Sequence, residues 1–310
     1  MVKHTLTLQH RTFRSVWKVL TEPVAEPSVM LEGLLREGSN LVIGGSAGVG
    51  KSLFVTNLGW CLATGRPFLG MEVARPYRVV YAQAEMNEWD VEERLRKQGE
   101  VITGGTDWSD VPYYYFSRKP WRWSPDIVEL TEVMDEVGCE VLILDPLSRI
   151  KPSEVSENDN DKMGYFLNET LNRLIVNEAL KALVIVHHFG KPSGEQPRDP
   201  LDLLRGASAL RDWMENFIWV GGKRHAPDAK LVFDKVRGFA PRDNLLVQRR
   251  GLVFQMSGDM REPVLAVLAD GAGHSKGEMN EVCGGDVSEA LKGLVEEGLV
   301  ERGSKGWRLR

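Results

Sequence analysis

A glycine-rich octet near residue 45 has the residue types that bind a polyphosphate. Residues 45–52 read Gly-Ser-Ala-Gly-Val-Gly-Lys-Ser and fit the pattern G-x-x-x-x-G-K-[ST] at each fixed position. Glycines let the backbone N–H groups turn toward phosphate oxygens, and the positive end of a following helix adds to the attraction. We therefore expect a nucleoside triphosphate, with Lys51 on its outer phosphates and Ser52 on Mg²⁺. The expected nucleotide contacts are Gly45, Ser46, Ala47, Gly48, Val49, Gly50, Lys51, Ser52 and Leu53.

The residues flanking this octet predict the elements that must hold it. Leu41–Ile43 is an apolar run typical of a buried strand. Residues 51–63 contain no proline and repeat apolar residues at helical spacing. A glycine-rich turn that matches the pattern by chance is the alternative, and the strand and helix on either side disfavour it.

A first carboxylate follows a second apolar strand. Residues 141–144 are Val-Leu-Ile-Leu and Asp145 comes next, which is a Walker B pattern. We expect Asp145 to accept hydrogen bonds from Mg²⁺-bound waters opposite Ser52. The alternative is an aspartate that opens a turn before Pro146.

A second carboxylate follows the strand expected at residues 77–84. Glu85 stands at its end, where a carboxylate can orient the water that attacks the γ-phosphate. A solvated acid at a strand end is the competing interpretation.

A third buried strand, at residues 182–188, ends in two histidines. A neutral imidazole at that edge can hydrogen-bond a γ-phosphate, whereas a core histidine would satisfy a backbone carbonyl. A metal site is disfavoured because adjacent strand residues, here His187 and His188, point to opposite faces.

The order of these motifs resembles the RecA-superfamily ATPases of the RepA type, the group that includes plasmid and phage ring helicases. The resemblance covers about residues 30 to 250. It implies hydrolysis of ATP with Mg²⁺ at subunit interfaces, and assembly into a hexameric ring or a filament. It also implies that Glu85 is the catalytic carboxylate and that His188 senses the γ-phosphate. The motifs that carry it are the phosphate loop, residues 65–70, Glu85, residues 145–149, 157–159, 187–191 and 205–210.

Catalysis at an interface requires a cation from the neighbouring subunit, because such a charge stabilises the transferring phosphoryl group. Residues 231–238 form an expected strand that runs into Lys-x-Arg-Gly, and this resembles the element that ring helicases insert into the adjacent site. Lys235 and Arg237 are therefore the leading candidates. Arg205 and Arg211 are alternatives. The RepA type places its arginine finger further along this helix, where this chain departs from the pattern and has Glu215. The alternative to a catalytic role is that Lys235 and Arg237 are solvent-exposed charges at the end of a β-hairpin.

Contacts with nucleic acid are less clearly indicated. The expected pore loops at residues 151–162 and 191–200 offer only a few cations, Lys162, Lys191 and Arg198 among them. Residues 108–123 mix aromatic and basic side chains that could stack bases and pair with phosphates. Residues 111–116 within that stretch also fit a strand of the sheet, and this structural interpretation is favoured.

Composition places limits on the class of protein. The 310 residues are 42% hydrophobic and 27% charged, with a net charge of −5, so a nucleic-acid contact would need a local basic surface. No apolar stretch approaches the roughly 18 residues that span a bilayer. Three dispersed cysteines and the absence of a signal-like start lead us to expect a cytoplasmic protein.

The sequence predicts an α/β fold in three parts. Residues 1–29 form an N-terminal strand and linker segment, and residues 30–258 a RecA-like ATPase domain with a mostly parallel twisted sheet flanked by helices. Residues 262–310 predict three helices and a hairpin that resemble a winged helix. This last segment has nine acidic and six basic residues, so a protein partner is as plausible for it as DNA.

The combined interpretation is an ATPase acting on DNA, expected to be single-stranded, as a homo-oligomeric ring or filament without a membrane partner. The alternative is a nucleotide-gated regulator or adaptor that recruits a partner through the winged helix and unwinds nothing.

Overall fold

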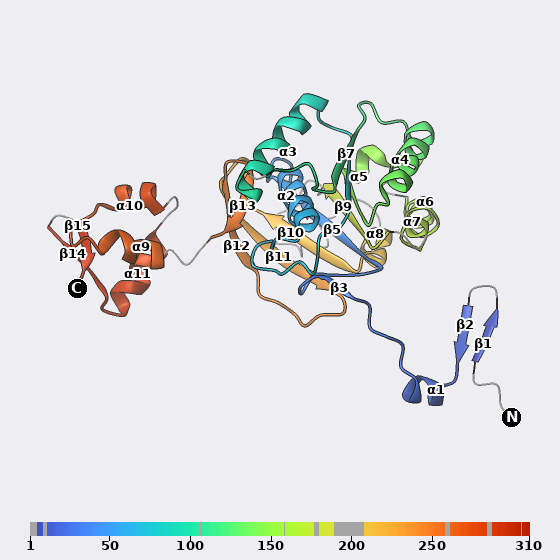
Figure 1. The fold of residues 1–310 in the computed structure, drawn as a ribbon, viewed down its shortest axis with the longest axis horizontal. Coiled ribbons are helices and arrows are strands. Elements are labelled where there is room, and N and C mark those ends of the chain that lie inside the picture. Colours follow the sequence, from blue (N-terminus) through green and yellow to red (C-terminus); the bar gives the residue numbers. More distant parts are fainter. Residues whose placement is uncertain are drawn as a thin grey trace.

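A nine-stranded sheet forms the centre of the computed structural model (Figure 1). The structure describes residues 5–8, 11–105, 107–157, 159–176, 180–188, 208–257, 261–283, 287–304 and 306–310. The strand order is β13-β12-β11-β10-β5-β9-β8-β6-β7, and the pairs from β10 to β7 are parallel. The parallel strands are β5 Ser39–Gly45, β6 Val79–Gln83, β7 Tyr113–Ser117, β8 Val141–Asp145, β9 Ala182–His188 and β10 Asn216–Gly221. The antiparallel extension consists of β11 Asp228–Val236, β12 Leu245–Arg250 and β13 Val253–Met256.

The middle residues of the central strands are apolar because both faces of the sheet are covered. Every residue of β5, β6 and β8 is buried. Alternate residues point to opposite faces, so Leu41 and Ile43 enter one hydrophobic layer and Val42 the other. This explains why the sequence shows short continuous apolar runs here instead of alternation.

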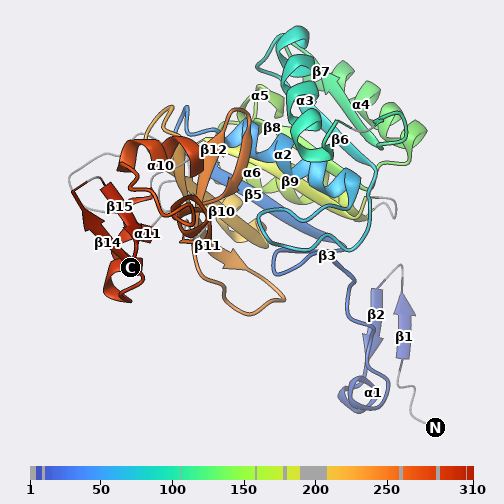
Figure 2. The ribbon, with the colours of Figure 1, turned by 60° about the vertical axis from the view of Figure 1, so that its left-hand side comes forward.

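Two long helices cover the first face: α2 Lys51–Thr64 and α3 Glu88–Thr103 (Figure 2). Phe54 of α2 makes edge-to-face ring contacts with Phe68 at 5.1 Å and with Phe254 of β13 at 5.7 Å. The ring of Phe254 thereby packs the antiparallel extension against the start of α2.

The second face is covered by shorter helical segments. They are α4 Trp123–Val137, α5 Leu147–Ile150, α6 Asn160–Tyr165, a π-helical stretch Phe166–Leu171, α7 Asn172–Val176 and α8 Ser208–Trp213. Trp123 packs edge-to-face on Phe166 at 5.1 Å. The α4 start is therefore fixed against the segment that follows β8.

The N-terminal segment forms a hairpin of its own. β1 Thr5–Leu8 pairs with β2 Arg11–Arg14, and α1 Val16–Thr21 follows. The sequence suggests an edge strand at residues 5–8, and its partner in the structure is β2 and not the main sheet. The chain then enters the core through the short pair β3 Val29–Leu31 and β4 Leu35–Arg36.

The C-terminal residues have a separate hydrophobic core (Figure 1). Helices α9 Arg261–Leu268, α10 Lys276–Cys283 and α11 Ser288–Glu296 precede the antiparallel pair β14 Val300–Gly303 and β15 Gly306–Leu309. His274, between α9 and α10, forms a β-bridge with Trp307 of β15. The helices lie within two residues of the ranges that hydrophobic periodicity indicates.

Within the described ranges, no helix combines the length and the apolar character needed to cross a bilayer.

Candidate active site

The glycine-rich octet lies between the end of β5 and the start of α2, as the sequence predicts. Gly48 and Gly50 have φ of +80° and +99°, in the left-handed region that favours glycine. A Cβ on Gly50 would lie 3.0 Å from the ring of Phe254. The loop therefore needs glycine at this position both for its backbone conformation and for its packing.

Lys51 is folded back over the loop. Its Nζ donates to the carbonyls of Gly45 and Ser46, at 2.8 Å each, and the residue is 4% exposed. Burial lowers the pKa of Lys51 to about 8, against the opposing charges of Asp145 and Glu85. The ammonium group thus lies at the loop, beside both predicted carboxylates.

Asp145 ends β8 directly across from the start of α2. The Ser52 hydroxyl hydrogen-bonds its carboxylate, and the Tyr81 hydroxyl donates to Oδ2 at 2.8 Å. Burial raises the pKa of Asp145, while the hydrogen bonds from Tyr81 and Ser52 and the charge of Arg94 oppose that rise. The two residues predicted to hold a metal are therefore in direct contact, and both offer the oxygen donors that Mg²⁺ prefers.

Glu85 and His188 meet at the same edge of the sheet. His188 is in register with Gly45 across the β5–β9 pair, and its Nε2 lies 3.7 Å from Oε1 of Glu85. Burial lowers the pKa of His188, and the nearby Lys51 ammonium lowers it further, against the charges of Glu85 and Asp145. The imidazole is consequently neutral at pH 7 and able to donate or accept a hydrogen bond.

Glu85 has a third neighbour that the sequence does not reveal. The guanidinium Nε of Arg149, from α5, lies 3.8 Å from Oε1 of Glu85. The backbone N–H of Glu85 donates to Oε1 of Gln83 at 3.0 Å, which orients the turn after β6.

Lys235 and Arg237 are the leading candidates for a cation supplied by a neighbouring subunit. They lie at the end of the parallel strands opposite to the phosphate loop. β11 runs antiparallel to β10 and ends where Val236 pairs with Asn216, level with Leu41 near the start of β5. Lys235 donates to the carbonyl of Arg211 at 3.0 Å, and the Arg237 backbone N–H donates to the side chain of Asn216. One chain therefore does not bring Lys235 or Arg237 to its own phosphate loop.

A turn that the sequence interpretation overlooks touches the phosphate loop. The backbone N–H of His225, between β10 and β11, donates to the carbonyl of Gly48 at 3.1 Å. A Cβ on Gly48 would lie 2.6 Å from Cγ of Arg224. No motif in the sequence marks His225 as part of the site. The sequence signal that could have indicated this turn is the glycine pair Gly221-Gly222, which precedes two cationic residues.

Arg94 of α3 is a second residue the sequence did not single out. Burial raises the pKa of both Asp145 and Tyr81, and the charge of Arg94 opposes that rise. Its buried Nη1 has no hydrogen-bond partner within the described ranges. A cation thus lies under the Walker B carboxylate, where no motif marks it.

Several predicted residues lie outside the described residues, namely Lys191, Arg198 and Arg205. Residues 113–117 of the aromatic and basic stretch form β7, as the structural interpretation expects. Residues 119–123 of the same stretch lie beyond that strand and line a cleft, described below.

Comparison with known proteins agrees with this geometry. Residues 6–194 match the family model of the AAA domain, and the chain belongs to that family. A solved structure with the same fold is the KaiC-like protein PH0186 from the hyperthermophilic archaeon Pyrococcus horikoshii OT3. It is 12% identical with a TM-score of 0.50, over 74% of this chain and 94% of that one. No curated protein matches the chain.

The fold and the family together define a RecA-like P-loop ATPase. The predicted site residues Lys51, Glu85, Asp145 and His188 lie at or shortly after the ends of β5, β6, β8 and β9. The carboxyl ends of parallel strands meet at one edge of a sheet, and this explains their convergence.

Proposed function

We propose that this protein hydrolyses ATP with Mg²⁺ and acts on single-stranded DNA as a homo-oligomeric ring or filament. The proposal that the protein hydrolyses ATP rests on one observation, the convergence of two contacts beside the phosphate loop. These are the Ser52–Asp145 contact and the Glu85–His188 contact. A metal-holding pair and a water-orienting carboxylate are the parts that phosphoryl transfer needs in addition to a phosphate cradle.

Each residue has a distinct role in this proposal. Lys51 and the loop N–H groups bind the β- and γ-phosphates. Ser52 and Asp145 would hold Mg²⁺, which would neutralise charge on the phosphoryl oxygens. Glu85 orients the attacking water and accepts its proton. The neutral His188 donates a hydrogen bond to the γ-phosphate and so registers its loss.

The proposal of an oligomer is supported by the position of Lys235 and Arg237. Both lie at the sheet edge away from the phosphate loop of their own chain. In an oligomer, a cation at this position would reach the site of another subunit and stabilise the transferring phosphoryl group there.

The proposal of a winged helix is supported by the order of elements after residue 260. Three helices, a strand pair and the bridge from His274 to Trp307 enclose a separate core. Such a module could contact DNA through the hairpin, which carries Arg302 and Arg308.

Steady-state turnover tests the hydrolytic assignment directly. Lys51→Ala and Glu85→Gln should each abolish most ATP hydrolysis, while light scattering should show a larger assembly with ATP than without it. Turnover by the wild type should increase with single-stranded DNA. Unchanged turnover in both variants would remove the assignment.

A nucleotide-gated regulator remains the second candidate, and charge favours it. The loop from Lys151 to Lys162 contains four acidic residues and two lysines, and residues 262–310 are net acidic. A forked DNA substrate separates the two functions. Slow hydrolysis that ignores single-stranded DNA, together with no strand separation, identifies a regulator.

A further inference from the structure

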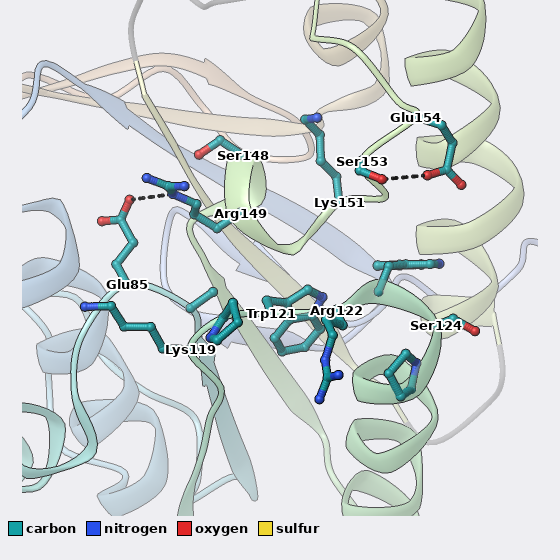
Figure 3. A pocket seen from close by; sticks show the side chains of 14 residues that line it. Glu85, Lys119, Trp121, Arg122, Ser124, Ser148, Arg149, Lys151, Ser153 and Glu154 are labelled. Atoms are coloured by element: carbon teal, nitrogen blue, oxygen red, sulfur yellow. Dashed lines mark hydrogen bonds and ion pairs between the residues drawn. The ribbon is translucent and has the colours of Figure 1, made fainter.

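An open cleft of about 1010 Å³ lies beside Glu85 (Figure 3), and its lining includes no residue of the phosphate loop. One wall is the segment between β7 and α4, residues 119–125. The other wall is α5 and the residues that follow it, from 148 to 154. The cleft therefore joins the catalytic carboxylate to a surface that the hydrolytic mechanism does not use.

The charged groups of this cleft are mostly cationic: Lys119, Arg122, Arg149 and Lys151, against Glu85 and Glu154. Lys151 donates to the carbonyl of Val155, and Arg149 lies 3.8 Å from Glu85. Lys119 and Arg122 are exposed and form no ion pair with any residue that the structure describes. These two cations are therefore available to an anionic ligand.

The cleft also contains aromatic rings in fixed positions. Trp121 packs edge-to-face on Phe116 at 5.9 Å, and Trp123 packs in the same way on Phe166 at 5.1 Å. Both indoles remain partly exposed. Rings held by the core can stack on a planar group with little loss of conformational entropy.

A second hollow of about 520 Å³ continues the cleft. It shares Trp123 and Glu154 with the first and adds Lys162 and Tyr165, whose ring is 69% exposed. The second hollow also contains the acid Asp161. Together the two hollows form a path that carries both cations and aromatic rings and exceeds the size of one nucleotide.

We propose that this path, the tryptophan cleft, binds single-stranded nucleic acid. Lys119, Arg122 and Arg149 would pair with successive phosphates, and Trp121 would stack on a base. Alternating phosphate contacts and aromatic platforms are how proteins bind single strands without reading sequence. The inference rests on the proposed function and locates the nucleic acid on this chain.

Arg149 makes the cleft a regulator of hydrolysis. Its guanidinium faces Glu85 and also lines the cleft. A backbone phosphate in the cleft competes with Glu85 for Arg149, because two phosphate oxygens can accept a bidentate pair of hydrogen bonds from the guanidinium, whereas Glu85 lies 3.8 Å from it. Glu85 then turns to the attacking water, so that an occupied cleft accelerates ATP hydrolysis.

Fluorescence anisotropy of the full chain tests binding. The probe is a labelled oligothymidylate of about 20 nucleotides, longer than the roughly 4–16 nucleotides one binding module covers. It is titrated across a salt series with Mg²⁺ and a non-hydrolysable ATP analogue. The double variant Lys119→Glu and Arg122→Glu should weaken binding at least about tenfold and reduce the salt slope by about 2. Lys230→Glu, an exposed charge reversal on β11, serves as the control and should retain wild-type affinity.

Turnover tests the coupling. Arg149→Gln should raise hydrolysis without DNA toward the stimulated rate of the wild type, so that the oligonucleotide no longer stimulates. Lower basal turnover with stimulation intact would overturn the role of Arg149.

The outcomes separate this inference from the proposed function. A wild type that hydrolyses ATP but binds no oligonucleotide refutes the DNA part of the function and the cleft with it. A wild type that binds, with unaltered affinity in the double variant, refutes the cleft alone. A double variant that changes the mass of the assembly at unaltered affinity shows that a second copy of the chain covers this surface.

Discussion

The imidazole Nε2 of His188 lies 3.7 Å from the carboxylate Oε1 of Glu85, although 103 positions separate the two residues along the chain. β9 and β6 are not adjacent in the sheet, since β8 lies between them. The contact closes over the end of β8, where Asp145 lies. The residue proposed to bind the γ-phosphate and the residue proposed to orient water are therefore in contact within one subunit.

Glu85→Gln should lower ATP turnover by about 10² or more, since general base catalysis contributes 10²–10⁴. Affinity for Mg-ATP should change little, because the phosphate loop and Asp145 are retained. Steady-state turnover and binding of a fluorescent nucleotide measure the two quantities. Glu88→Gln, an exposed change at the start of α3, is the control. Equal losses of turnover in both variants would contradict the role of Glu85.

Tyr81→Phe should raise the Mg²⁺ concentration for half-maximal turnover about tenfold. The hydroxyl hydrogen-bonds Oδ2 of Asp145 at 2.8 Å, and groups that orient a metal ligand typically affect metal affinity 10–100-fold. A Mg²⁺ titration of the turnover at saturating ATP measures the shift. Tyr115→Phe is a matched control, because the Tyr115 hydroxyl also bonds a carboxylate, that of Glu92, outside the site. An unshifted titration would show that Tyr81 does not orient Asp145.

Arg237→Ala should reduce turnover at least about 100-fold, because cations supplied across an interface contribute 10³–10⁵ in related chemistry. Mixing this variant with Lys51→Ala should restore part of the activity. The first supplies an intact phosphate loop and the second an intact cation. Turnover of the mixture across a dilution series measures this complementation. A mixture no more active than its components would place the stabilising cation elsewhere, with Arg211 as the next candidate.

Glu140→Gln should destabilise the fold above pH 4.5 by about 1.5–3 kcal/mol, the range for hydrogen bonds to charged groups. Glu140 is buried at the start of β8 and accepts from Arg75 at 2.7 Å and from the Arg78 backbone N–H at 3.1 Å. Burial alone would raise its pKa, but the hydrogen bonds and charges of Arg75 and Arg78 outweigh burial and lower it from 4.5. A lowered carboxyl pKa contributes stability above pH 4.5 that is lost as the pH falls through the folded-state value.

Chemical unfolding at a series of pH values tests this prediction. The difference between wild type and Glu140→Gln should be largest at neutral pH and should shrink below pH 4.5. Glu93→Gln, which removes an exposed ion pair on α3, should have a small effect at all pH values. A Glu140→Gln difference that does not depend on pH would show that packing, and not charge, is responsible.

Elements with strong local signals could be predicted closely. The β8 strand Val141–Asp145 and the β9 strand Ala182–His188 have the bounds that their apolar runs indicate. Helix α2 begins at Lys51, as the phosphate-loop pattern requires. These features depend on neighbouring residues alone, because buried parallel strands are continuously apolar and a phosphate loop needs glycines at set positions.

Features that join distant segments could not be predicted. The approach of Arg149 to Glu85, the packing of Arg224 on Gly48 and the place of Arg94 beneath Asp145 involve residues without any motif. The aromatic and basic stretch shows the difference within one segment. Residues 113–117 follow the expected strand, whereas Trp121 and Arg122 line a cleft whose second wall comes from α5.

The sequence by itself determined the phosphate loop, the strands that carry Glu85, Asp145 and His188, and the chemistry that these side chains offer. The tertiary structure decided the order of the strands, and therefore which of these groups touch and which cations lie at the opposite edge. The physical reason is that backbone conformation and hydrophobic periodicity are local properties of a chain. Strand order and burial, which shift the pKa of Lys51 and His188, depend on packing between segments far apart in the sequence.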